Sequence, residues 1–334
     1  MNLSVKYLGL TLKSPLMCGA SPLADHLDGV RKLEDAGASA IVLRSLFEEQ
    51  IEREELAFDE HVSSHASSSA ESAGGYFSAF NDFAFDSEHY LDHLRKVKAA
   101  VSVPVIGSLN GISHGGWERY AFLIENAGAS ALELNFYDLP TDPTKSCAEV
   151  EARYIEILKS IRAMVSIPIA VKLSPYFSSL PHFVTQLEQA GANGVVLFNR
   201  LYQPDIDTEK LAANPLLHLS DSTELPLRLR WMAILEPFFK GSIAASGGIH
   251  TSQDAIKAVM AGASGVQLVS ALIKNGAAHL KVMESEMSQW LETHEYTSLE
   301  QMRGSMSMRT CPDTSAFTRT NYMKILHGWK SSQL

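Results

Sequence analysis

A short Ala-Gly-Ala pattern that occurs four times constrains the fold of this chain more than any other feature. It stands at 36–38, 127–129, 190–192 and 261–263, each time after a helix-like stretch and before an apolar run. Glycine suits the left-handed C-cap of a helix, and its small neighbours allow a tight turn into a buried strand. The repeat therefore predicts helix–strand units that follow one another along the chain.

Further apolar segments supply the other strands. The ranges 102–106 and 166–171 carry a proline near their start, where a strand tolerates its missing N–H, and 241–245 and 15–18 complete the set. Strands that are apolar on both faces are typical of a covered parallel sheet. Eight of them alternating with helices indicate an α/β fold, a (β/α)8 TIM barrel. The rival Rossmann-type sheet would carry GxGxxG at its first turn, and the sequence has none there.

The spacing of the units predicts a single domain with one long insertion. We expect the barrel to occupy residues 1–310, with the insertion at about 46–100, after the second strand, and a C-terminal extension at 311–334. The insertion contains a Ser-rich run at 63–69. This run is either an excursion over the barrel mouth or a plain loop.

Composition and charge exclude several classes of protein. Among 334 residues, Lys and Arg total 28 against 38 Asp and Glu, so the net charge is −10. This charge is wrong for a surface that binds nucleic acid or an anionic membrane. Three separated cysteines are typical of reduced thiols, and the N-terminus lacks the apolar core of a signal peptide. We expect a cytoplasmic protein without a metal site.

Polar residues stand where the predicted strands end. In TIM barrels the chemistry takes place at the C-terminal ends of the strands, so these residues are the candidates for a site. In chain order they are Ser21, Arg44, Ser45, Ser108, Asn110, Asn135, Lys172, Asn199, Gly247, Gly248 and Ser270. Their occurrence at successive strand ends predicts an active site at one rim of the barrel.

The last two strand ends carry the most specific motif. The turn at 246–249 precedes Thr251 and Asp254, which have the spacing of a capping box, and Ser270 adds a hydroxyl. Glycines and a helix start favour a phosphate, although a tight turn with a helix cap explains the same residues. Lys172 ends an apolar strand, where it could pair with an anionic cofactor ring or form a Schiff base.

These motifs resemble those of the dihydroorotate dehydrogenase family, FMN-binding TIM barrels that oxidise dihydroorotate to orotate. The resemblance covers residues 3–303 and implies FMN as the cofactor and a place in pyrimidine biosynthesis. It is carried by five segments: 16–21, 133–135, 171–177, 246–249 and 267–272.

The resemblance also implies roles for individual residues. Ala20 and Ser21 would lie against the flavin, Lys172 at its N1/O2 edge, and Asn135 and Asn199 between flavin and substrate. The other residues expected at the cofactor are Arg44, Ser45, Ser108, Gly247, Gly248, Val269 and Ser270, the last four of them at the phosphate.

Departures from the family pattern lie on the substrate side. The family has a Cys or Ser base three residues after the position of Asn135, within Asn-x-x-(Cys/Ser)-Pro-Asn, whereas this chain has Asp138 there and lacks the following Pro-Asn. Tyr137 is the alternative acid or base. Arg44 replaces a lysine and Arg200 a serine, and two arginines suit a small anionic substrate.

Three functions follow from these residues. The first is an oxidoreductase that oxidises dihydroorotate or a related anion by hydride transfer to FMN. The second is a flavoprotein that has lost this oxidation and serves electron transfer or sensing. The third is an aldolase or isomerase that uses Lys172. A homodimer is expected from the resemblance alone, and the electron acceptor and redox partner stay open.

Overall fold

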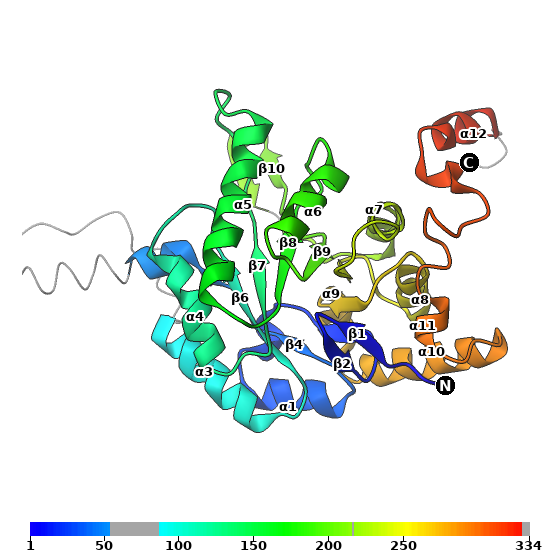
Figure 1. The fold of residues 1–334 in the computed structure, drawn as a ribbon, viewed down its shortest axis with the longest axis horizontal. Coiled ribbons are helices and arrows are strands. Elements are labelled where there is room, and N and C mark those ends of the chain that lie inside the picture. The colour runs from blue at the N-terminus through cyan, green and yellow to red at the C-terminus, as the bar shows by residue number, and fades with distance from the viewer. Residues whose placement is uncertain (54–86, 216, 329–334) are drawn as a thin grey trace, which may run out of the picture.

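The computed structural model describes residues 1–53, 87–215 and 217–328 as a barrel surrounded by helices (Figure 1). The Ser-rich run at 63–69 lies outside the described residues. Eight parallel strands form the barrel: β3 (Leu16–Cys18), β4 (Ile41–Val42), β6 (Val105–Asn110), β7 (Ala131–Asn135), β8 (Ile169–Leu173), β9 (Gly194–Leu197), β12 (Ser242–Ser246) and β13 (Gly265–Leu268). Neighbours along the chain pair in parallel, and β13 pairs with β3 to close the ring. The predicted TIM barrel is confirmed.

Helices follow the strands and cover the outside of the barrel. They are α1 (Leu27–Asp35), α3 (Ser87–Ala100), α4 (Arg119–Asn126), α5 (Cys147–Met164), α6 (Leu180–Gln189), α7 (Leu225–Leu235), α8 (Ser252–Met260), α9 (Ser270–Asn275) and α10 (His279–Thr293). The glycines of the four Ala-Gly-Ala repeats all have positive φ, between 97° and 118°, directly after α1, α4, α6 and α8. The repeat therefore ends four helices in the way that the sequence predicts.

The second strand of the barrel is interrupted. Residues 43–45 separate β4 from β5 (Leu46–Phe47), and both short strands pair with β6. At the break, the Tyr90 hydroxyl of α3 accepts the Ser108 N–H at 2.9 Å and donates to the Ser108 carbonyl at 3.2 Å. α3 contacts α1 and α4 like any barrel helix, although it lies inside the range 46–100 that we expected to be an insertion.

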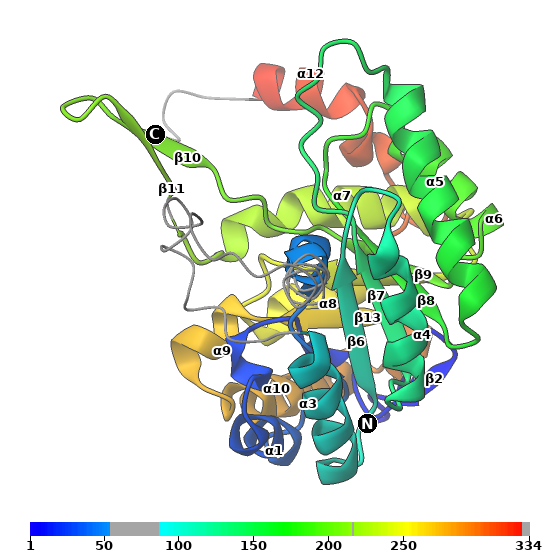
Figure 2. The same ribbon diagram turned by 90° about the vertical axis from the view of Figure 1, so that its left-hand side faces the viewer.

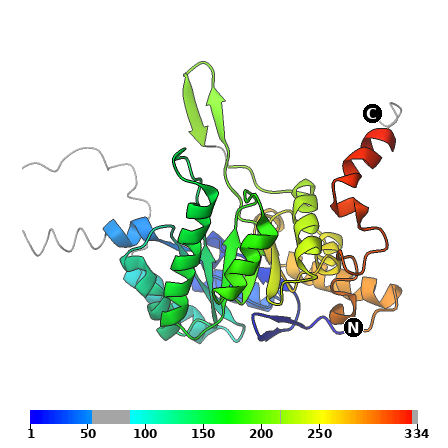
Figure 3. The ribbon, with the colours of Figure 1, turned by 45° about the horizontal axis from the view of Figure 1, so that its top comes forward.

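Two antiparallel hairpins were not predicted from the sequence. The hairpin of β1 (Val5–Tyr7) and β2 (Leu10–Leu12) packs where β12 and β13 begin, and the Leu8 N–H donates to the Ser242 hydroxyl at 2.9 Å. The hairpin of β10 (Pro204–Asp207) and β11 (Ala212–Pro215) follows β9 and projects away from the barrel (Figures 2 and 3). Both hairpins consist of strands of three or four residues, which are too short to show a clear alternation of apolar and polar residues.

Short helices complete the described chain: η1 (Pro22–Ala24), η2 (Gly116–Glu118), η3 (Ser222–Glu224), α11 (Leu299–Met302), η4 (Thr314–Phe317) and α12 (Thr320–Gly328). The described part of the expected extension consists of η4 and α12, and α12 buries none of its residues and stands apart from the barrel (Figure 3). Among the described residues, no helix combines the length and apolar character needed to span a membrane.

Candidate active site

The centre of the barrel holds three polar side chains that contact one another. Glu133 comes from β7, Lys172 from β8 and Gln267 from β13, and all three are buried. Lys172 Nζ donates to Glu133 Oε1 at 3.2 Å and to Gln267 Oε1 at 3.0 Å, and Gln267 Nε2 donates to Glu133 Oε2. Lys172 therefore lies inside the barrel as one member of this triad, which the sequence did not predict.

An asparagine pair lies beside the triad at the mouth. Asn135 is two residues after Glu133, so their side chains point to the same face of β7, and Asn135 pairs in register with Lys172. Asn199 Nδ2 donates to Asn135 Oδ1 at 2.6 Å. The structure thus brings together Asn135, Lys172 and Asn199, three residues that the sequence analysis assigned to one site.

The strand ends of β3 and β4 place their candidates close to the barrel wall. Ser21 is buried and Ala20 half-buried, and the hydroxyls of Ser45 and Ser108 lie 2.7 Å apart. Burial raises the pKa of the Cys18 thiol to about 12, with Ser21 opposing the shift weakly. Cys18 therefore stays protonated at neutral pH and does not supply the cysteine base that this chain lacks.

Arg44 forms an ion pair with Asp25, which follows η1. Burial raises the pKa of Asp25 and the Arg44 guanidinium opposes this shift. The arginine that stands in place of a family lysine is thus held by a carboxylate of the neighbouring βα loop, while its Nε has no hydrogen-bond partner among the described residues.

Asp138 lies on the loop after β7 and is held by α5. Arg153 forms an ion pair with its Oδ2, and the Tyr154 hydroxyl donates to the same oxygen at 2.7 Å. Asp138 Oδ1 forms no hydrogen bond or ion pair with the described residues. The Tyr137 hydroxyl instead accepts the N–H of Tyr202, which follows β9, at 3.4 Å. The two candidate bases therefore have different surroundings.

The turn after β12 packs closely against the start of α7. Gly247 and Gly248 have φ of 79° and 77°. A Cβ on Gly248 would lie 2.6 Å from the Leu225 nitrogen, and one on Gly247 would lie 2.7 Å from Arg228 Nη2. Only glycine fits both the conformation and the space, so this turn can pack directly against the start of α7.

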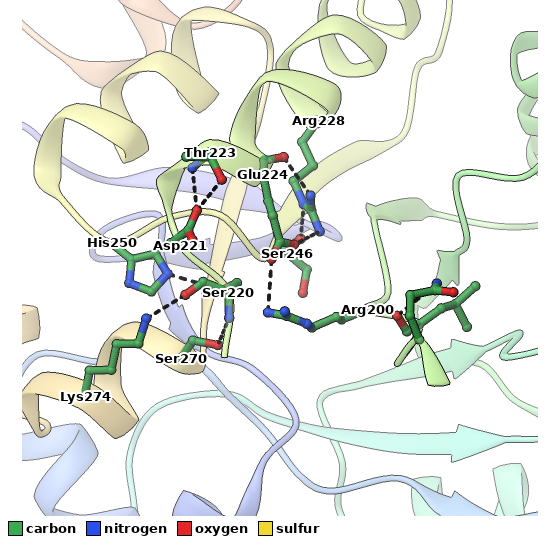
Figure 4. Close-up of polar contacts among 12 residues, drawn as sticks. Arg200, Ser220, Asp221, Thr223, Glu224, Arg228, Ser246, His250, Ser270 and Lys274 are labelled. Atoms are coloured by element: carbon green, nitrogen blue, oxygen red, sulfur yellow. Dashed lines mark hydrogen bonds and ion pairs between the residues drawn. The ribbon is translucent and has the colours of Figure 1, made fainter. Parts of the chain in front are cut away.

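Ser220 lies between Ser270, Lys274 and His250 (Figure 4). Its N–H donates to the Ser270 hydroxyl at 3.1 Å, its carbonyl accepts Lys274 Nζ at 2.9 Å, and its hydroxyl lies 3.2 Å from His250 Nε2. Burial and the nearby Lys274 lower the pKa of His250. Hydroxyls, an ammonium and an imidazole thus gather next to the two glycines. We call Gly247, Gly248, Ser220, Ser270 and Lys274 the cradle.

The start of α8 is capped by its own residues. Thr251 accepts the Asp254 N–H, and the Asp254 carboxylate accepts the N–H groups of Thr251 and His250 as well as the Ser222 hydroxyl at 2.7 Å. Burial favours the neutral acid, but the Ser222 and backbone donors outweigh it and lower the pKa of Asp254. The predicted capping box is present, and it anchors the segment that carries Ser220.

Two arginines share the carboxylate of Glu224. Arg200 Nη1 lies 3.1 Å from Glu224 Oε1, and Arg228 Nη2 lies 3.5 Å from Glu224 Oε2. Arg228 is buried, and its Nε donates to the Ser246 carbonyl at 2.6 Å. Arg200, predicted at the substrate, therefore extends toward the cradle side of the mouth in this structure (Figure 4).

Several residues of this mouth were missed by sequence reasoning. Glu133 carried a signal, because it is a charged residue within an otherwise apolar strand. Ser220, Arg228 and Lys274 carried none, because they precede or lie within helices and reach the mouth only through the fold. Among the described residues, no cluster of histidine, cysteine, aspartate and glutamate has the arrangement of a metal site.

Comparison with known proteins gives consistent matches. The sequence model of the family described as dihydroorotate dehydrogenase matches residues 81–291. The dihydroorotate dehydrogenase B (NAD(+)) catalytic subunit of Thermoplasma volcanium is 25% identical over 318 residues, covering 91% of this chain and 98% of that protein. The same subunit of Pyrococcus abyssi is 26% identical over 317 residues, covering 90% and 98%.

A relative with a different name matches over a similar share of this chain. The NAD-dependent dihydropyrimidine dehydrogenase subunit PreA of Escherichia coli (strain K12) is 23% identical over 334 residues, covering 93% of this chain and 78% of that protein. Proteins named for two different substrates are thus similar to this chain at nearly the same level of identity.

Proposed function

This chain belongs to the dihydroorotate dehydrogenase family, and from that premise we propose that it is an FMN-dependent oxidoreductase acting on dihydroorotate or a related small anion. The observation that carries the proposal is the gathering of the cradle, Lys172 and the Asn135–Asn199 pair at one barrel mouth. FMN, when bound, would accept a hydride from the substrate carbon. The chain itself would bind, orient and deprotonate the substrate.

The cradle fits one phosphate. The glycine turn lies beside Ser270, whose hydroxyl proton is free to be donated, and beside Lys274, whose ammonium keeps donors beyond its bond to the Ser220 carbonyl. Since the α8 start is capped by Asp254, the phosphate would depend on the turn and on Ser270 rather than on this helix end. Ala20, Ser21, Arg44, Ser45, Ser108 and Val269 would complete the cofactor site. A single phosphate cradle without GxGxxG favours FMN over FAD.

Asp138 would serve as the catalytic base. Arg153 and Tyr154 both contact Oδ2, which orients the carboxylate and leaves Oδ1 to accept a proton. Tyr137 is the alternative, since its hydroxyl lies on the same loop. Asn135, Asn199 and Arg200 would bind the substrate, and bidentate pairing makes arginine suited to a carboxylate.

The substitution at the base position favours one alternative, an FMN-binding flavoprotein that serves electron transfer or sensing without oxidising dihydroorotate. An aldolase is disfavoured, because Lys172 lies between Glu133 and Gln267, an environment suited to a charged ammonium rather than a nucleophilic amine.

Electrons would leave through another protein. Relatives are named as a catalytic subunit and as the subunit PreA, so we expect a partner chain. Cys18, Cys147 and Cys311 are the three cysteines of the sequence, fewer than the four that usually hold an iron–sulfur cluster. A homodimer and a cytoplasmic location stay predictions.

Purification followed by reconstitution with FMN tests this proposal. We expect a yellow protein that retains stoichiometric FMN and releases no FAD. Anaerobic addition of dihydroorotate and related small acids should then bleach the flavin spectrum with one or more of them. Retention of FMN without bleaching would favour the electron-transfer alternative, and failure to retain FMN would reject both.

A further inference from the structure

The triad of Glu133, Lys172 and Gln267 satisfies its own polar groups almost completely. Each carboxylate oxygen of Glu133 accepts one hydrogen bond, and both ends of the Gln267 amide are engaged. Lys172 has three N–H donors, of which the triad accepts two. One donor of a fixed ammonium therefore remains for a ligand at the barrel mouth.

Glu133 also balances the charge of Lys172. The carboxylate is 1% exposed and the lysine 7% exposed, so neither charge is well solvated. A buried charge without a partner is strongly unfavourable, which makes each of the two groups depend on the other. Among the described residues, Lys172 is the cationic partner of Glu133.

The charge of Glu133 also affects two buried tyrosines elsewhere in the barrel. Burial raises the pKa of Tyr7 and of Tyr90, and in both cases the Glu133 carboxylate adds to the shift. Tyr7 comes from the hairpin at one end of the barrel, and its buried hydroxyl has no hydrogen-bond partner among the described residues. Glu133 thus contributes to the electrostatics of the interior beyond its contact with Lys172.

We propose that Glu133 and Gln267 are positioning residues that fix the Lys172 ammonium and set the net charge that the bound flavin meets. This inference rests on the proposed function only in taking FMN as the group that Lys172 faces. Glu133 offsets the charge of Lys172, and Gln267 of β13 accepts a hydrogen bond from the same ammonium. A packing role alone would give no dependence of flavin chemistry on the sign of the charge that is removed.

Sulfite provides the test, because it is an anion that adds to oxidised flavin and bleaches it without any substrate. In the FMN-loaded protein, Glu133→Gln removes the compensating negative charge, so sulfite should bind about tenfold more tightly or better. Lys172→Met removes the positive charge and should weaken sulfite binding by about tenfold or more. The double variant, with a neutral pair, should fall within about threefold of the natural protein.

Glu125→Gln is the matched control. Its carboxylate accepts the Ser166 and Ile167 N–H groups before β8 begins, at the opposite end of the barrel, so its loss should change the sulfite affinity less than twofold. The flavin reduction potential gives a second readout, which should rise in Glu133→Gln and fall in Lys172→Met. Shifts of both single variants in the same direction, or an unchanged Glu133→Gln protein, would overturn the inference.

Urea unfolding of the flavin-free protein separates this inference from the proposed function. If Glu133 and Lys172 act as a buried ion pair that Gln267 holds in place, the double variant should be more stable than either single variant. The reason is that the double variant leaves no unpaired buried charge. A double variant no more stable than Glu133→Gln alone overturns the inference. Failure to bind FMN would overturn the proposed function, whereas the unfolding result would still decide whether the pairing exists.

Discussion

The two sides of the barrel mouth differ in where their polar groups find partners. On the cradle side, Ser220 of the segment between β9 and α7 contacts both Ser270 and Lys274 of α9, and Asp254 anchors this segment through Ser222. On the β7 side, Asp138 is held from behind by Arg153 and Tyr154 of a single helix.

We assign cofactor binding to the cradle side of the mouth and substrate chemistry to the β7 side. Gly247, Gly248 and Ser270 of the cradle match the family pattern, whereas the residues after β7 depart from it. Among the described residues the two groups form no hydrogen bond or ion pair with each other, so a change in one should leave the other in place. Variants on the two sides should therefore have distinct effects, one on flavin retention and the other on flavin reduction.

Gly248→Leu should have the strongest consequence on the cradle side. A Cβ there would collide with the start of α7 and demand a backbone conformation that leucine avoids. We expect the purified variant to retain no FMN, measured by absorbance after gel filtration. Gly9→Leu is the control, because Gly9 has the same φ of 78° with open space around it. Equal flavin loss in both variants would contradict a specific role of the cradle.

Asp138→Asn should spare flavin retention and slow flavin reduction. Loss of a general base costs about 10²–10⁴-fold in rate, and we expect at least the lower figure in anaerobic stopped flow with a verified substrate. Asp142→Asn, an exposed aspartate on the same loop, is the control. An unchanged rate would mean that Asp138 is structural, and a comparable loss in Tyr137→Phe alone would assign the base to Tyr137.

Arg153→Met should have a smaller effect of the same kind. The variant keeps the carboxylate of Asp138 and its hydrogen bond from Tyr154 but removes the ion pair that orients Oδ2. We expect flavin reduction to slow by about tenfold, with FMN retained. A rate equal to that of the natural protein would show that orientation by Arg153 does not matter.

Asp254→Asn should act mainly on stability, by about 1 kcal/mol, the usual loss for a helix cap. Because the folded pKa of Asp254 is lowered, its contribution is fully present above the unfolded pKa of about 3.9 and is lost as the pH falls through the folded value. Urea unfolding should therefore show a gap between the natural protein and the variant at pH 7 that narrows below about pH 4.

The sequence was sufficient for the barrel because its repeat marks the ends of four helices. Each Ala-Gly-Ala glycine ends a helix at a predictable conformation, and the strands that follow are buried and mostly apolar. The β10–β11 hairpin escaped prediction because its strands are exposed and lack an apolar alternation. The break between β4 and β5 depends on Tyr90 of a distant helix.

For the candidate site, the sequence predicted which residues lie at the barrel mouth better than it predicted their hydrogen-bond partners. Asn135, Asn199 and Lys172 do meet, because parallel strands bring their C-terminal ends together. The partners of Lys172 could not be read directly, since Glu133 and Gln267 come from strands 39 and 95 residues away and meet it only through the closure of the barrel. The Asp138 contacts likewise depend on how α5 packs.

Anaerobic titration of the FMN-reconstituted protein with dihydroorotate and related small acids tests the central claim most directly. The proposed oxidoreductase should lose its visible flavin absorbance with at least one of these acids, and the absorbance should return on admission of an oxidant. A flavin spectrum that stays unchanged with every acid, although dithionite bleaches it fully, would contradict the claim.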